Sequence, residues 1–258
     1  MPDAAEKIVQ LRGLLRERFP AAHRQIPPPP PPPPPLSPPT APASDDDISP
    51  LSATSAAFPL GVKALDALGA VEPGTIVEMV GRRPGCGAGL LVAALARAAV
   101  RERRHLALID GADAFDSVSA GLDAADCRFL LWLRCGRRIE NALKAADRLL
   151  RDGNLPRVVM DLQLCDPRAI RLGLAAAGGN SAWHRLRGLA EKTGAVLAAF
   201  TPEPTIPCAR LRLELRHRWS LDDLDRLPAD PAALAVDFEV TRRVQPPAAA
   251  EPAWARAG

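Results

Sequence analysis

The sequence predicts an α/β protein with a mostly parallel sheet, flanked by helices, and an antiparallel hairpin at its C-terminal side. Between residues 75 and 200, short apolar runs alternate with helical segments at the spacing typical of a parallel sheet. Residues 210–216 and 235–241 instead alternate apolar and polar side chains, as half-exposed strands do. A hydrophobic content of 47% in 258 residues supplies the core of one domain of ordinary size plus tails.

Five apolar runs are expected to form the buried strands of the parallel sheet, because each is shorter than a typical helix. They are residues 75–80, 105–110, 129–133, 157–161 and 195–200. Helices are expected at residues 61–69, 90–100, 137–153 and 181–194, and a loop followed by a helix at 113–122.

The C-terminal hairpin is expected to consist of the two alternating segments, 210–216 and 235–241. They are joined by a long, acidic, proline-containing stretch at residues 220–231. The alternation places polar residues on one face of each strand, so we expect residues 210–216 to present a charged outer face to solvent.

Residues 1–25 are expected to form an amphipathic helix, because their apolar residues recur at helical spacing. This stripe consists of Ile8, Leu11, Leu14 and Leu15. Two interpretations stay open: the helix rests on the core of its own chain, or it docks on a partner protein.

A proline-rich linker is expected at residues 26–55, since nine consecutive prolines at 27–35 favour a stiff polyproline II spacer. The folded domain is then expected at residues 56–244. Residues 245–258 are expected to be a disordered tail.

Composition excludes several classes of protein. The five cysteines form no C-x-x-C pair, which argues against a zinc site or a disulfide framework. No signal peptide and no run of about 20 apolar residues is found, so we expect a cytoplasmic protein without a membrane partner. A net charge of +3 permits an acidic partner, but the absence of tyrosine leaves few platforms for stacked bases.

The glycine-rich stretch 81–89 follows an expected strand and precedes an expected helix, which is the context of a phosphate-binding loop. Such a loop needs a lysine for the β- and γ-phosphates and a serine or threonine for Mg²⁺. Every register that could hold them is occupied by other residues, namely Cys86, Gly87, Ala88 and Gly89.

Several segments resemble the core of RecA-type recombinases in their order and spacing. Residues 58–69 and 73–81 resemble the beginning of that core, and residues 108–116 resemble its second strand and following loop. Residues 157–161 resemble its Walker B strand, and 210–216 its late antiparallel strand. The resemblance covers roughly residues 56–244 and implies a RecA-like fold.

The chain departs from that family at the positions the resemblance would make catalytic. Ala112 stands where the family carries a catalytic glutamate, and Thr201-Pro202 stands where it carries a γ-phosphate sensor. Asp161 is the remaining part of the Mg²⁺ and water machinery, while Asp113 is either a shifted base or an ordinary loop or capping residue. We therefore expect no ATP hydrolysis and no catalytic residue.

A degenerate nucleotide-binding site is one hypothesis for the glycine-rich stretch. Its residues would be Gly81, Gly85, Gly87, Gly89 and Asp161. Backbone N–H groups can hold an anion, with Arg82 and Arg83 close by, or the glycines only form the turn from strand to helix. We expect no cofactor, with weak ATP binding as the alternative, and no metal site.

A DNA-binding surface is the second hypothesis, carried by arginines where the family's first DNA-binding loop and its following helix fall. These are Arg168, Arg171, Arg185 and Arg187. Contacts of such residues with phosphates would give sequence-independent affinity. The alternative is an ordinary basic helix face.

Degenerate RecA-like chains of this kind resemble the ImuA-type accessory proteins of bacterial translesion synthesis. That resemblance implies a non-catalytic adaptor in the DNA-damage (SOS) response, with a polymerase-related protein as partner and DNA as a second contact. One alternative is a SulA-type cell-division inhibitor that binds a tubulin-like protein. A second is a weak ATP-dependent, DNA-binding paralogue of the recombinases.

Overall fold

The computed structural model describes residues 60–69, 71–224, 226 and 233–244. The expected N-terminal helix with Ile8, Leu11, Leu14 and Leu15 lies outside the described residues. So do the expected linker at 26–55 and the expected tail at 245–258.

The described residues form one seven-stranded sheet in the order β3-β2-β4-β5-β1-β6-β7. Its strands are β1 (Ile76–Val80), β2 (Leu106–Asp110), β3 (Leu130–Arg134), β4 (Arg157–Asp161), β5 (Val196–Thr201), β6 (Leu211–Leu215) and β7 (Phe238–Arg243). Neighbouring strands are parallel except for β6 and β7, which form an antiparallel pair. The predicted fold class is therefore confirmed.

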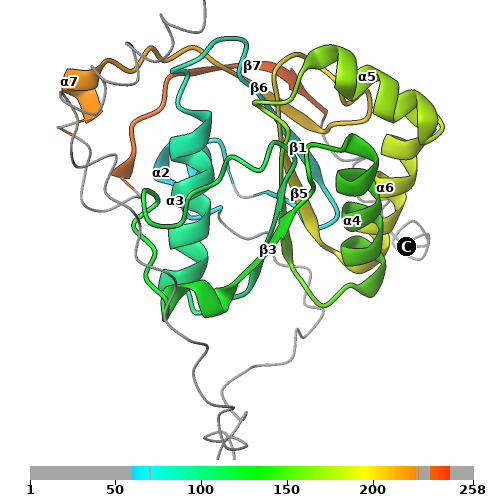
Figure 1. Cartoon of the computed structure of the whole chain (residues 1–258), viewed down its shortest axis with the longest axis horizontal. Helices are drawn as coiled ribbons and strands as arrows, with labels where there is room; N and C mark the ends of the chain where they lie inside the picture. Colours follow the sequence, from blue (N-terminus) through cyan, green and yellow to red (C-terminus); the bar gives the residue numbers. More distant parts are fainter. Residues whose placement is uncertain (1–59, 70, 225, 227–232, 245–258) are drawn as a thin grey trace, which may run out of the picture. The chain divides into compact units, whose positions relative to one another are not determined.

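Helices cover both faces of the sheet (Figure 1). They are α2 (Lys63–Asp66), α3 (Ala88–Arg101), α4 (Ile139–Asp152), α5 (Pro167–Ala176), α6 (Asn180–Thr193) and α7 (Leu221–Leu224), with a 3₁₀ helix, η2 (Asp126–Phe129). The helices α2 and α3 pack on one face of the sheet, and α4, α5 and α6 pack on the other. The sheet thus has two apolar layers, as both-sided coverage of a parallel sheet requires.

Local sequence explains the long helices. In α4 the buried positions recur at helical spacing, so one stripe faces the sheet and the charged residues face outward. The buried residues are Ile139, Ala142, Leu143, Ala146 and Leu150. The helix α5 begins at Pro167 behind the N-cap residue Asp166, whose side chain accepts a hydrogen bond from the backbone N–H of Arg168 at 2.6 Å.

Two sequence-based expectations about helices were wrong. Residues 113–122 form turns instead of a helix. The Asp110 carboxylate accepts the N–H groups of Ala114 and Phe115, both at 3.0 Å, and this holds the chain in a loop. Conversely, a helix that was not expected, α5, forms at Pro167–Ala176, because the Asp-Pro pair is a strong helix start.

The expectation of a charged, solvent-facing side on β6 was also wrong. The strand β6 lies between β1 and β7 and is not an edge strand. The side chains of Arg212 and Glu214 are only 17% and 11% exposed. They are covered because Arg212 pairs with Glu78 on β1, and Glu214 pairs with Arg82 after β1.

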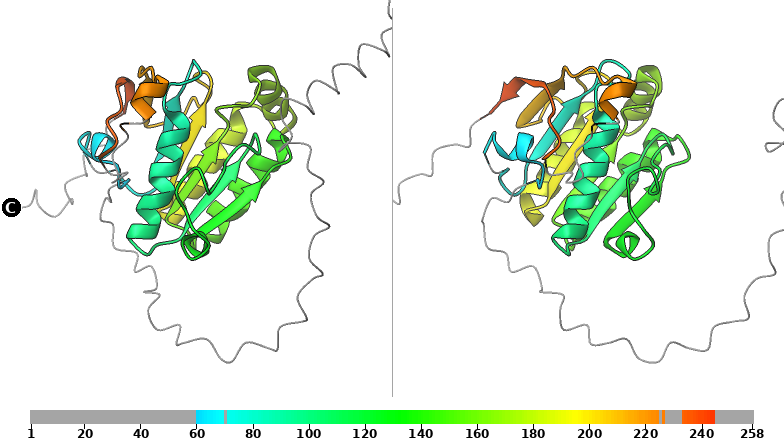
Figure 2. Two further views of the ribbon diagram at one scale, coloured as in Figure 1. Left: turned by 60° about the vertical axis from the view of Figure 1, so that its left-hand side comes forward. Right: turned by 90° about the vertical axis from the view of Figure 1, so that its left-hand side faces the viewer.

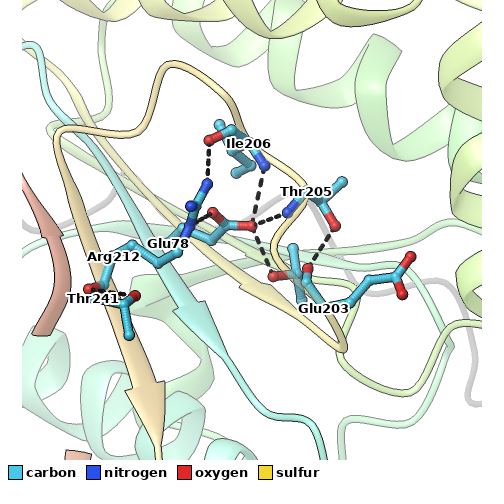
Figure 3. Close-up of polar contacts among 7 residues, drawn as sticks. Glu78, Glu203, Thr205, Ile206, Arg212 and Thr241 are labelled. Carbon is cyan, nitrogen blue, oxygen red and sulfur yellow. Dashed lines mark hydrogen bonds and ion pairs between the residues drawn. The ribbon is translucent and has the colours of Figure 1, made fainter. Parts of the chain in front are cut away.

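Glu78 is the centre of a buried polar network (Figure 3). Its side chain is fully buried, and its Oε2 accepts a hydrogen bond from Arg212 Nε at 2.5 Å. Its Oε1 accepts bonds from Thr201 Oγ1 at 3.0 Å, Thr205 N–H at 2.6 Å and Ile206 N–H at 3.1 Å. Arg212 also donates to the Ile206 carbonyl at 2.8 Å. The network therefore joins β1, β5, β6 and the segment between β5 and β6.

In the part of the chain that the structure describes, no helix has both the length and the apolar character needed to cross a bilayer.

We expect Arg212→Met to lower the free energy of unfolding by about 3 kcal/mol, because it leaves the Glu78 carboxylate buried without a countercharge. Chemical denaturation measures this change. Glu78→Gln in the Arg212→Met background should recover most of the loss, since a neutral amide keeps an oxygen acceptor for the three remaining donors. Equal stability of Arg212→Met and the wild-type protein would contradict a structural role for the pair.

Candidate functional site

The glycine-rich loop joins β1 to α3 at the end of the sheet formed by the carboxyl ends of the parallel strands. Gly87 is the N-cap residue of α3 and has φ 88°, and Gly85 has φ 73°. Both angles lie in the left-handed region, which residues with a Cβ rarely adopt. The glycines at 85 and 87 are therefore needed for the turn, whereas Gly89 lies within the first turn of α3, where a Cβ would meet no atom within 4 Å.

Trp219 covers this loop. Its backbone N–H donates a hydrogen bond to the Gly85 carbonyl at 3.0 Å. A Cβ built on Gly87 would lie 2.6 Å from the indole Nε1 of Trp219, so the indole fills the direction that a side chain at position 87 would take. The two views of Figure 2 show α7, which follows Trp219 in the chain, at the same end of the domain as the beginning of α3.

A second group of contacts fills the base of the loop. Gln163, which follows β4, donates from Nε2 to the Gly81 carbonyl at 2.7 Å. A Cβ on Gly81 would lie 2.6 Å from the Cys86 sulfur and 2.9 Å from Gln163 Nε2. Neither Trp219 nor Gln163 was identified from the sequence as part of this site. Gln163 could have been found from its position, because it comes only two residues after Asp161, which had been singled out. The loop is thus packed by groups of its own chain.

Asp161 is the last residue of β4, at the same end of the sheet, and carries an unfavourable charge. Burial is the main cause that raises the pKa of its carboxyl to about 6, and the charge of the nearby Asp110 contributes to this rise, while the hydrogen bond from the Gln163 N–H at 3.0 Å opposes it. A carboxylate that binds a countercharge would instead have a lowered pKa. The described residues place no cation on it, so its ionisation is destabilising.

Asp110 and Asp113 serve the local structure. Asp110 is 1% exposed, and besides the two loop N–H groups it accepts a hydrogen bond from the indole of Trp132 on β3 at 3.2 Å. Asp113 accepts the N–H of Gly136 at 3.1 Å. This contact supports the capping interpretation of Asp113 over that of a shifted base.

The position of the expected phosphate sensor is also occupied by structural contacts. Thr201 is fully buried, and its hydroxyl donates to Glu78 within the network described above. Pro202, which follows it, has no N–H group to donate. The side chains at the end of β5 therefore support the sheet.

Two thiols near this site, those of Cys135 and Cys165, are not nucleophiles at neutral pH. Burial raises the pKa of Cys135 to about 11 and that of Cys165 to about 12, with Asp113 and Asp161 respectively adding to the rise. The reactive form of cysteine is the thiolate, which these thiols do not form at neutral pH. Among the described residues, no group of three or more His, Cys, Asp or Glu side chains is arranged to hold a metal ion.

The structure brings all five predicted nucleotide-site residues to one end of the sheet. Gly81, Gly85 and Gly87 belong to the loop after β1, and Asp161 ends β4. Gly89 lies two residues beyond Gly87, in the first turn of α3.

The predicted DNA-binding arginines lie on two helices and mostly have carboxylate partners. Arg171 on α5 pairs with Glu203 at 2.5 Å. On α6, Arg185 pairs with Asp147 at 2.8 Å, and Arg187 lies 3.4 Å from Glu191. These pairs reduce the positive potential available to a phosphate backbone. Arg168, in the first turn of α5, is exposed.

A search of protein-family models and of curated protein sequences finds no match to this chain.

We expect Asp161→Asn to raise the free energy of unfolding at pH 7.5 by about 1–3 kcal/mol. The folded protein holds a proton at Asp161 more tightly than the unfolded chain does, so ionisation removes stability as the pH rises from about 4 to about 6. The variant should lack this part of the pH dependence, while its amide oxygen can still accept the Gln163 N–H. Urea denaturation across that pH range is the measurement.

Asp222→Asn is the matched control, because Asp222 is an exposed carboxylate on α7. It removes the same charge without removing a buried group. Lower stability of Asp161→Asn than of the wild-type protein at pH 7.5 would mean that the Asp161 charge is stabilised in the fold.

Proposed function

We propose that this protein is a non-catalytic, RecA-like adaptor of the DNA-damage response, which supports translesion DNA synthesis through protein contacts. The observation that carries the proposal is the indole of Trp219 against Gly87, at the N-terminus of α3. A phosphate-binding loop needs a lysine side chain and free backbone N–H groups at this point. Here the lysine is replaced by glycine, and an aromatic side chain of the same protein covers the loop.

The retained scaffold supports a role in binding. Both apolar layers of the sheet are complete, whereas the positions expected to position phosphates and water are replaced or engaged in structural contacts. Phosphoryl transfer depends on positioning and charge stabilisation, which these replacements remove. We infer that the protein acts through contacts of its surface with other molecules.

The edge strand β3 supplies one such surface. Among the described strands it pairs with β2 alone, so the backbone N–H and C=O groups on its other side bond to no described strand. Two of its apolar side chains, Leu131 and Trp132, are 45% and 37% exposed. An edge strand with exposed apolar side chains can accept a strand from another protein. We assign this edge to the polymerase-related partner.

Pull-down from cells after DNA damage tests this assignment. We expect Leu131→Asp to reduce recovery of a polymerase-related protein by about tenfold, because a charge at a desolvated contact is costly. Leu172→Asp is the matched control: Leu172 is 72% exposed on α5, away from β3, and its change should leave recovery unaltered. Thermal unfolding of both variants checks that the fold persists.

Three results would overturn the proposal. Equal loss of the partner in both variants would exclude β3 as the contact. Recovery of a tubulin-like division protein would favour the cell-division inhibitor. Tight binding of single-stranded DNA without a protein partner, lost on changing Arg185 and Arg187, would favour a DNA-binding paralogue.

We also expect the purified protein to release no phosphate from ATP above the level of Asp161→Ala. The double change Gly87→Lys with Ala88→Thr should not create activity, because position 87 has φ 88° and faces the Trp219 indole. Release of inorganic phosphate over time is the measurement. Turnover that Asp161→Ala abolishes would replace the adaptor with an ATPase.

A further inference from the structure

A pocket lies at the end of the sheet where the parallel strands begin, opposite the end that carries the glycine-rich loop. Its volume is about 410 Å³, and its walls are α6, residues 207–210 before β6, and the end of β7. Two of these walls are joined because the Val244 N–H donates to the Arg210 carbonyl at 2.8 Å, just beyond the pairing of β7 with β6. The volume lies in the range of small-molecule sites.

Three guanidinium groups line this pocket, and their charges are not equally balanced. Arg210 pairs with Glu72 at 2.8 Å. Arg187 lies near Glu191, but its Nε is buried and makes no hydrogen bond within the described part of the chain. Arg242 forms no ion pair with any carboxylate that the structure describes. The pocket therefore holds one guanidinium without a described ion-pair partner, and a buried Nε that lies 3.4 Å from a Glu191 oxygen without a hydrogen bond to it.

Arg187 and Arg242 both line the pocket, as Cys208 does. Both guanidinium groups act on the Cys208 thiol, which is 6% exposed: burial raises its pKa, and the two positive charges oppose that rise. Two positive charges that line one pocket repel each other, and an anion bound between them would offset that repulsion.

We propose that this pocket binds a small organic phosphate, with the phosphate between Arg187 and Arg242 and the organic part against Pro207 and Val244. Guanidinium groups bind phosphate through paired, charge-assisted hydrogen bonds, and several oxygens can serve both arginines at once. The buried Nε of Arg187 makes no hydrogen bond to any described residue, which is costly, and a phosphate oxygen would give it one. The site does not depend on the proposed adaptor function.

Calorimetric titration of the full chain with phenyl phosphate, at constant ionic strength, tests the site. Arg242→Gln should weaken binding at least about tenfold. Glu191→Gln, which removes the carboxylate competing for Arg187, should tighten binding severalfold, and this gain does not depend on how well Arg242→Gln folds. Arg83→Gln is the matched control, because Arg83 is an exposed arginine of the glycine-rich loop.

Unchanged affinity of both Arg242→Gln and Glu191→Gln would overturn the site. Loss of binding in Arg83→Gln would move the phosphate to the glycine-rich loop. Benzoate binding as tightly as phenyl phosphate would refute selectivity for phosphate. Displacement of phenyl phosphate by a thymidine oligonucleotide of higher affinity would make the ligand a nucleic acid and refute a small-molecule site.

Discussion

The buried pair of Glu78 and Arg212 is the constraint on which the arrangement of this sheet depends. A carboxylate in the middle of a central strand is stable only when a countercharge and hydrogen-bond donors surround it. Arg212 comes from β6, and the other donors come from Thr201, Thr205 and Ile206 at the end of β5 and beyond. Meeting this requirement places β6 beside β1 and fixes the path of the chain between β5 and β6.

That placement has a consequence at the glycine-rich loop. The chain leaves β6 next to the end of β1, so the connection toward β7 passes over the loop and brings Trp219 onto Gly85 and Gly87. Gln163 completes the packing from the side of β4. The end of the sheet that in a nucleotide-binding protein would hold phosphates is here filled by the protein's own groups, and Asp161 remains there as a destabilising charge.

The end of the sheet where the parallel strands finish therefore differs in its charges from the end where they begin. At the end that carries the glycine-rich loop, Glu214 pairs with Arg82. At the opposite end, Arg242 forms no ion pair with a carboxylate among the described residues, and it lines a pocket of small-molecule size. The two binding functions that we propose lie outside the glycine-rich loop: the edge strand β3 for a protein, and the pocket beside α6 for an anion.

The sequence by itself determined the strands, the long helices and the absence of lysine, serine and threonine from positions 86–89, because periodicity and residue type are local properties. The Asp166-Pro167 helix start was also local, although it was overlooked. Only the tertiary structure decided that Arg212 is buried against Glu78, 134 residues away, and that Trp219 covers Gly87. Alternation along 210–216 indicates a strand, but which neighbours cover its charged residues depends on strand order, and no local pattern encodes that order.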